Sequence, residues 1–160
     1  MRRKVIAGNW KMNMLPNEAM DYITKLSKLV KDTENEVILC VPYTDLFYAL
    51  MHAQDTNIKI GAQNMHFAEK GAYTGEVSGK MLKVIGVEYV IIGHSERRQY
   101  FNETDESVNK KVKAAFENEL KPIVCVGETL EQRENGLTEK IITNQTRLAL
   151  AGLSNAQVKN

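Results

Sequence analysis

Short apolar runs alternate with longer segments of helical periodicity along this sequence. The apolar runs occupy residues 5–10, 37–41, 58–63, 89–92 and 122–126. Nearly continuous apolar runs of this length, bounded by Gly, Pro or polar residues, are typical of strands that are buried on both faces of a parallel sheet. We therefore predict a strand at each of these positions.

The segments between the runs carry apolar residues at helical spacing, and most have a recognisable start or stop. Pro16 suits a first helical turn, and Gly152 suits the end of a last helix over 139–150. Candidate N-caps are Thr44, Thr104 and Thr138. Two predicted helices have an apolar face, formed by Ala19, Ile23, Leu26 and Val30 and by Val108, Val112, Ala115 and Phe116. Two more run through Leu46, Leu50 and Ala53 and through Met81, Leu82 and Ile85, and one further turn lies near 130–134.

Strict alternation of strands and helices predicts one α/β domain over residues 1–160, with a parallel sheet and right-handed crossovers. Two architectures fit this pattern. A doubly wound sheet needs about five such units, whereas a (βα)8 barrel needs eight and typically about 250 residues. The pattern alone does not decide between them, although the absence of G-x-G-x-x-G and G-x-x-x-x-G-K-[ST] from the sequence disfavours a doubly wound nucleotide-binding domain.

Composition narrows the functional classes. The chain has 160 residues, 43% hydrophobic and 26% charged, which suits a soluble domain with a substantial core. Its formal net charge of +1 gives no general attraction for nucleic acid or an anionic membrane, and no apolar run is long enough to span a bilayer. The basic start is followed by too short an apolar stretch for a signal peptide. We therefore expect a cytoplasmic protein.

The cysteines and histidines do not form a recognisable metal or disulfide pattern. Cys40 and Cys125 lie inside apolar runs without C-x-x-C spacing, so we expect buried, reduced thiols. His52, His66 and His94 have no metal-ligand spacing to each other or to the cysteines, so we predict no metal site.

Two polar stretches follow predicted strands or connect them. The fourth run ends at Gly93 and His94, and ligands of parallel sheets bind beyond the carboxyl ends of the strands. His94 is therefore a candidate functional residue, the alternative being a structural histidine. Residues 64–79 are polar, contain Gly and are too long for an ordinary strand-to-helix turn, which predicts a functional or contact loop.

The strings Gly93-His94-Ser95-Glu96-Arg97-Arg98 and Ala7-Gly8-Asn9-Trp10-Lys11-Met12-Asn13 resemble the triosephosphate isomerase family, as do residues 61–64, 71–76 and 125–128. The resemblance extends from Arg3 to about Val158. It implies a TIM (βα)8 barrel, a homodimer, and interconversion of dihydroxyacetone phosphate and glyceraldehyde 3-phosphate through an enediolate, without a cofactor.

By the same resemblance, the sequence contains only the first five βα units of the barrel. The catalytic glutamate, the closing lid and the phosphate-binding glycines belong to later units of the family. We therefore expect the chain alone to be inactive. The alternative is a non-catalytic partial barrel that serves as a folding or assembly module, and a doubly wound signalling domain is disfavoured because no acidic residues cluster after the first strand.

The resemblance also implies roles for individual residues. His94 corresponds to the electrophile that polarises the substrate carbonyl; this family is the well-known example of a catalytic imidazole kept neutral by a helix N-terminus. Residues 95–98 are compatible with such a helical turn. Lys11 corresponds to the active-site lysine that binds the phosphate and the enediolate, and Asn9 to a substrate-binding residue. The alternatives are a surface lysine and a turn asparagine.

Supporting roles follow from the same comparison. Glu96 corresponds to the carboxylate that positions the lysine, and Ser95 to a hydroxyl near the catalytic base, with ordinary helix capping as the alternative for both. Thr74 corresponds to the residue that reaches the partner subunit; otherwise it lies in a surface loop. The resemblance gives Arg97 and Arg98 structural ion pairs, and Cys125 a packing role.

Overall fold

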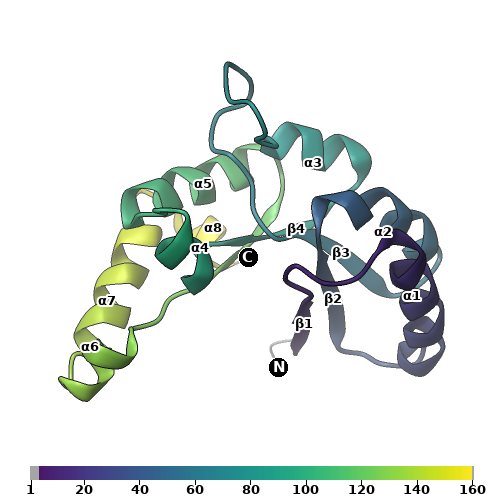
Figure 1. Ribbon diagram of the computed structural model, residues 1–160, viewed down its shortest axis with the longest axis horizontal. Helices are drawn as coiled ribbons and strands as arrows, with labels where there is room; N and C mark the ends of the chain where they lie inside the picture. Colours follow the sequence, from purple (N-terminus) through teal and green to yellow (C-terminus); the bar gives the residue numbers. More distant parts are fainter. Residues whose placement is uncertain (1–3, 160) are drawn as a thin grey trace.

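The computed structural model describes residues 4–159, and in it the predicted strands form one parallel sheet. The strands are β1 (Val5–Asn9), β2 (Glu36–Val41), β3 (Ile58–Ala62), β4 (Tyr89–Ile92) and β5 (Lys121–Val124). They lie in the order β1-β2-β3-β4-β5, so each strand pairs with its neighbours in sequence. A doubly wound sheet reverses its strand order at a switch point, and this sheet does not. It curves into a half-barrel (Figure 1), which confirms the barrel prediction.

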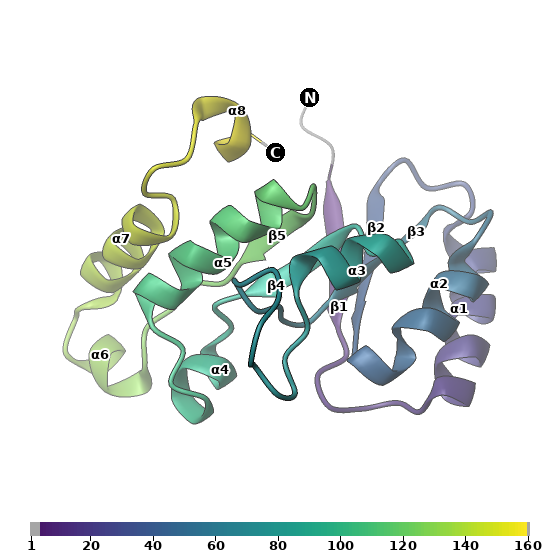
Figure 2. The same ribbon diagram turned by 90° about the horizontal axis from the view of Figure 1, so that it is seen from above.

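Helices line the outer side of the curved sheet (Figures 1 and 2). They are α1 (Pro16–Val30), a short 3-10 turn η1 (Tyr43–Asp45), α2 (Leu46–Ala53), α3 (Gly79–Ile85), α4 (Ser95–Tyr100), α5 (Asp105–Glu117), α6 (Leu130–Glu134), α7 (Thr138–Ala149) and α8 (Asn155–Val158). Pro16 begins α1 as predicted, and Thr104 caps α5 by accepting a hydrogen bond from the Ser107 N–H. The structure also contains α8, which we did not predict.

Two predicted N-caps are wrong. Thr44 lies inside η1, and Asp45 takes the N-cap position of α2, because the Asp45 N–H bonds to the Pro42 carbonyl and closes a tight turn directly after β2. Thr138 is the first residue of α7, after an N-cap at Leu137. Its hydroxyl bonds instead to Glu128, with 3.4 Å between Oγ1 and Oε1.

Strand boundaries differ from prediction by one or two residues. β1 ends at Asn9 and β3 at Ala62, although the Trp10 N–H still donates to the Cys40 carbonyl of β2 at 3.0 Å. β5 starts at Lys121 and ends at Val124, where its partner β4 also ends. Pro122 is therefore the second residue of β5, not the first.

The two faces of the sheet form two separate apolar clusters. Alternate residues of β2, Val37, Leu39 and Val41, pack outward against the helices in the main core. Ile38 and Cys40 point to the inner face, where they cluster with β4 residues and with Cys125. The short helix predicted through Met81, Leu82 and Ile85 is confirmed as α3, which contributes Leu82 to the core and turns Met81 and Ile85 outward, 55% and 43% exposed.

The thiols of Cys40 and Cys125 are both free, the first buried and the second half-buried. Burial raises the pKa of Cys40 to about 12 and also raises the pKa of Cys125, so both remain protonated at neutral pH. They behave as small apolar side chains of the inner face. Within residues 4–159, no helix has the length and apolar character needed to cross a bilayer.

Candidate active site at the carboxyl ends of the strands

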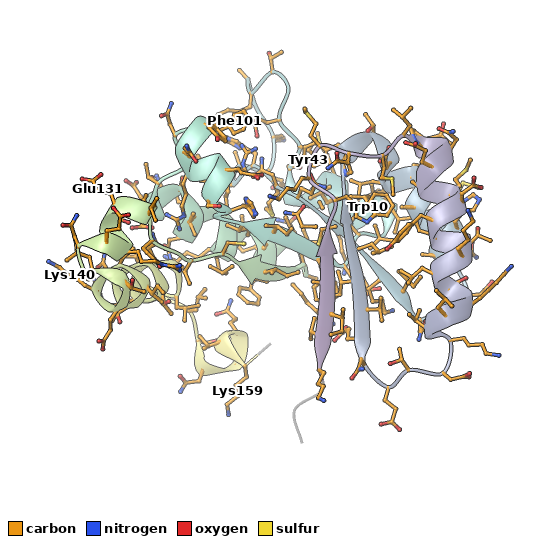
Figure 3. All side chains as sticks on the ribbon, turned by 60° about the horizontal axis from the view of Figure 1, so that its bottom comes forward. Trp10, Tyr43, Phe101, Glu131, Lys140 and Lys159 are labelled. Carbon is orange, nitrogen blue, oxygen red and sulfur yellow. The ribbon has the colours of Figure 1, made fainter. Side chains whose placement is uncertain are left out.

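A cavity of about 310 Å³ opens where β1 to β4 end. It is lined by Asn9, Lys11, Met12, Pro42, Tyr43, Gln63, Asn64, His94, Glu96, Arg97 and Phe101. Figure 3 shows Tyr43 and Phe101 at this end of the sheet, opposite Lys159. Four of the residues singled out from the sequence, Asn9, Lys11, His94 and Glu96, therefore share one cavity. Ser95 does not line it, and Thr74 lies on the exposed 64–78 loop outside it.

The backbone of Lys11 is held in a left-handed conformation, with φ at 56°. For a residue with a side chain this conformation costs about 1 kcal/mol or more and persists only when neighbours impose it. The Asn9 side-chain oxygen accepts the Lys11 N–H at 3.0 Å, and the Gln63 amide donates to the Lys11 carbonyl at 2.9 Å. The same Gln63 nitrogen also donates to the Cys40 carbonyl at 3.0 Å. Lys11 is thus fixed through its main chain from two sides.

Gln63 is a residue that our sequence analysis missed as part of the site. We counted it as the last residue of a strand. The signal was available, because it is a polar residue at the carboxyl end of β3, where the same rule that selected His94 applies.

The Lys11 ammonium group points to Glu96, with 2.7 Å between Nζ and Oε1. This hydrogen bond is the main reason that the pKa of Glu96 lies below its ordinary value. Both side chains are about half exposed (52% and 42%), so water screens the pair and its contribution to stability is small. Its effect is geometric, because it directs the lysine charge toward His94.

His94 is the N-cap of α4, and its Nδ1 accepts the Glu96 N–H at 3.3 Å. Residues 95–98 do open a helix, as predicted, and the Glu96 N–H points at the ring, whereas the Arg97 and Arg98 N–H groups donate to the His94 carbonyl. An Nδ1 that accepts a hydrogen bond carries no proton, so a neutral ring has its proton on Nε2. The Glu96 carboxylate lies 3.6 Å from Nδ1 and is bonded to Lys11.

A buried polar network supports the backbone just before His94. Glu103 accepts the Gly93 N–H at 3.1 Å and forms a buried ion pair with Lys111. Lys111 also donates to the Asn64 side chain at 2.8 Å, and the Tyr43 hydroxyl donates to the Asn64 carbonyl at 2.7 Å. Burial raises the pKa of Tyr43, which therefore stays a donor. The network links β4, α5 and the base of the 64–78 loop.

The two arginines contribute differently. Arg98 donates to the Gly93 carbonyl at 2.9 Å and pairs with Asp105 at 2.6 Å, which is the structural role that we expected. Arg97 lines the cavity, with its guanidinium 4.9 Å from the centroid of the Phe101 ring and its Nε 3.6 Å from Glu103.

The fold and the cavity together define the class of protein to which this chain belongs. A parallel βα half-barrel with its polar side chains gathered at the carboxyl ends of the strands has the organisation of a TIM-barrel enzyme. The sequence model of one family, described as "Triosephosphate isomerase", matches residues 4–160. The chain belongs to the triosephosphate isomerase family.

Similarity to individual proteins agrees with this family membership. Proteins named triosephosphate isomerase from Clostridium botulinum (strain Loch Maree) and Acetivibrio thermocellus are 58% and 59% identical to 99% of this chain, which spans 64% of their length. A crystal structure of triosephosphate isomerase from Bartonella henselae has a TM-score of 0.91 at 40% identity, covering 98% of this chain and 65% of that one.

Proposed function

We propose that this chain carries the electrophile and the phosphate-binding lysine of a triosephosphate isomerase. The reaction interconverts dihydroxyacetone phosphate and glyceraldehyde 3-phosphate, without a cofactor and through an enediolate. One observation carries the proposal: Lys11, Glu96 and His94 form a connected chain inside a single cavity at the carboxyl ends of the strands. The free thiols are in keeping with a cytoplasmic location.

In this proposal His94 donates a hydrogen bond to the substrate carbonyl. Removal of a proton next to a carbonyl places negative charge on its oxygen, and a preorganised donor stabilises that charge. Because Nδ1 accepts the Glu96 amide, Nε2 is the atom that carries the donated hydrogen. The ring enters the reaction neutral, as is well known for this family.

Lys11 supplies the positive charge for the phosphate and the enediolate. Its left-handed backbone and its contact with Glu96 aim a flexible side chain into the cavity. The side-chain oxygen of Asn9 is occupied by the Lys11 N–H, which leaves the Asn9 NH₂ group to donate to substrate. Ser95, exposed at the first position of α4, would lie beside the catalytic base.

The proton-abstracting base is the missing part of this site. Among the described residues that line the cavity, Glu96 is the only carboxylate, and it is bonded to Lys11. The base would come from a further barrel unit. The same observation favours the second candidate function, a non-catalytic partial barrel that takes part in folding or assembly.

A homodimer is part of the proposal. The 64–78 loop, which carries Thr74, stands out from the body of the molecule (Figure 1). Phe47, Met51 and Ile85 line an open groove between α2 and α3, together with polar residues such as Lys59 and Glu88, and they are 61%, 56% and 43% exposed. Exposed large apolar side chains are candidates for an interface. A second copy would cover this surface and receive Thr74 near its own Asn9 and Lys11.

The proposal is tested with a completed barrel. Residues 4–160 are joined to the remaining segment of the Clostridium botulinum relative, and triose phosphate conversion is measured in a coupled assay. The proposal predicts turnover that His94→Gln removes almost completely, while a Ser107→Ala control in the α5 cap retains it. A folded chimera without turnover, or one that His94→Gln leaves fully active, would refute the proposal.

A further inference from the structure

The 64–78 loop keeps its shape through its own contacts, although it projects from the molecule (Figure 1). At its neck the His66 N–H donates to the Val77 carbonyl at 2.8 Å, and His66 forms a parallel bridge with Ser78. His66 is therefore fixed to the returning arm of the loop by its main chain.

The His66 ring then connects this neck to the crown of the loop, residues 68–75. Its centroid lies 4.3 Å from that of Phe67 and 4.2 Å from that of Tyr73. Its Nδ1 accepts the Ala68 N–H at 3.0 Å. The Tyr73 ring in turn lies over Gly71, whose φ of +143° leaves no room for a side chain, since a Cβ would come within 3.0 Å of that ring. One imidazole thus contacts both ends of the crown.

This arrangement depends on the protonation state of the ring. A neutral imidazole has one nitrogen that accepts, and here that nitrogen is Nδ1. An imidazolium has two N–H donors, so its Nδ1–H would face the Ala68 N–H and the hydrogen bond would become a repulsive contact. Histidine is the side chain that ordinarily changes charge between pH 5 and 8.

We infer that the neutral ring of His66 is an internal brace that holds the crown of the loop, and Thr74 with it, in position before a partner is bound, and that protonation of the ring releases the crown. The inferred effect on a second copy rests on the homodimer that we propose above. The brace itself does not, because all of its contacts lie within one chain.

The charged and titratable groups around His66 do not replace this hydrogen bond. Within the loop they are Glu69, Lys70, Tyr73 and Glu76. From α3, Lys80 pairs with Glu69 at 2.6 Å, so that carboxylate is already engaged. From α5, the Lys110 ammonium lies 5.6 Å from the Phe67 ring centroid. Aromatic faces tolerate a cation, so the acid-sensitive element is the hydrogen bond and not the ring stack.

Amide hydrogen exchange of Ala68 in the 160-residue chain tests the brace. Exchange is followed by NMR at pH 7.5 and pH 5.0 and expressed relative to the intrinsic rate at each pH. Loss of one hydrogen bond of ordinary strength predicts a fall in protection of about five- to tenfold at the lower pH. The Leu120 amide, buried and bonded to the Ala115 carbonyl at 2.8 Å, reports whether the fold as a whole is unchanged.

Two variants distinguish the effect of the Nδ1 hydrogen-bond acceptor from the effect of the stacked ring. His66→Asn places an oxygen near the Nδ1 position that cannot be protonated, so protection of Ala68 should be retained at both pH values. His66→Phe keeps a stacked ring without an acceptor and should lose protection at both. Unchanged protection in the parent chain between the two pH values overturns the inference. The inference is also overturned if the protection of Ala68 falls by the same factor in His66→Asn.

The consequence for a partner is measured separately by sedimentation of the same variants in the completed barrel, because the 160-residue chain is also expected to associate through the edges of β1 and β5. Self-association that weakens at pH 5.0 in the parent chain but not in His66→Asn supports the inferred coupling. A chain that never self-associates refutes the homodimer proposal, and the Ala68 exchange result still decides whether the brace exists. The two failures are therefore distinguishable.

Discussion

At the scale of single residues, the main finding is that Lys11 is positioned by side-chain amides acting on its backbone, while its ammonium group is bonded to Glu96. In a completed barrel, Lys11→Ala should weaken binding of a phosphate-bearing enediolate analogue by about 1.5–3 kcal/mol, the contribution of a charge-assisted hydrogen bond. Isothermal titration measures this loss. Lys25→Ala on the exposed face of α1 is the control. Equal affinity of the parent and Lys11→Ala would show that the lysine does not contact the phosphate.

A second residue-scale prediction concerns Asp45, which is fully buried (0% exposed). One of its oxygens accepts the Thr44 hydroxyl at 3.2 Å, and the other has no hydrogen-bond partner. Burial raises its pKa above the unfolded value. The folded state therefore holds this proton more tightly than the unfolded state, and the contribution to stability is lost as pH rises through the folded pKa.

Asp45→Asn removes this titration. The difference in unfolding free energy between Asp45→Asn and the parent should therefore increase from pH 3 to pH 7, because ionisation of the buried carboxyl destabilises only the parent. Urea denaturation at each pH measures it. A difference that stays constant with pH would contradict the assignment.

At the scale of elements, the buried pair of Glu103 and Lys111 joins α5 to the start of the His94 turn. Lys111→Met leaves the buried Glu103 carboxylate with only the more distant Arg97 cation, which should cost up to about 3–5 kcal/mol of stability, the range for an unpaired buried charge. Glu103→Gln together with Lys111→Met should cost less than the sum of the single changes, because the two groups interact directly. Denaturant unfolding of the four proteins gives the coupling energy. Additive effects would mean that the pair is not coupled.

At the scale of the whole molecule, the cavity contains no free carboxylate from the described residues, because Glu96 is bonded to Lys11. We predict that the 160-residue chain alone has no meaningful isomerase activity, since a general base typically contributes about 10²- to 10⁴-fold. A coupled assay on protein of verified mass checks this. Normal turnover would mean that Glu96, Glu103 or Glu128 replaces the base.

The sheet itself leads to the second whole-molecule prediction. Among the described strands, β1 and β5 each pair with only one neighbour. Val5 and Ile6 of β1 are 52% and 59% exposed, and an apolar hollow of about 340 Å³ lies between β1, β2 and α1. Exposed strand edges recruit other strands. We expect concentration-dependent self-association that the complementary barrel segment of a relative suppresses. Sedimentation showing a monomer at high concentration, without dye-binding apolar surface, would contradict this.

The sequence alone determined the local elements and the position of His94 in the site. Apolar runs gave all five strands, the Thr104 cap gave the start of α5, and the position of His94 after β4 gave its place in the cavity. These features depend on neighbours in sequence, and their periods of two and 3.6 residues are visible in one chain. The boundaries moved by one or two residues because the ends of β5 follow the pairing with β4, which is set by another segment.

Only the tertiary structure decided which distant residues meet. The clamp of Gln63 on Lys11 joins residues 52 positions apart, and Lys111 reads from the sequence as an ordinary solvated lysine of a helix. Lys111 is buried because α5 lies against β4 and the base of the 64–78 loop. There its ammonium group pairs with Glu103 and donates a hydrogen bond to Asn64. The outward position of Met81 was decided in the same way, since the side of α3 that faces the sheet depends on how the crossover packs. A hydrophobic pattern gives the period of an element, and the surface against which the element packs depends on the arrangement of all the others.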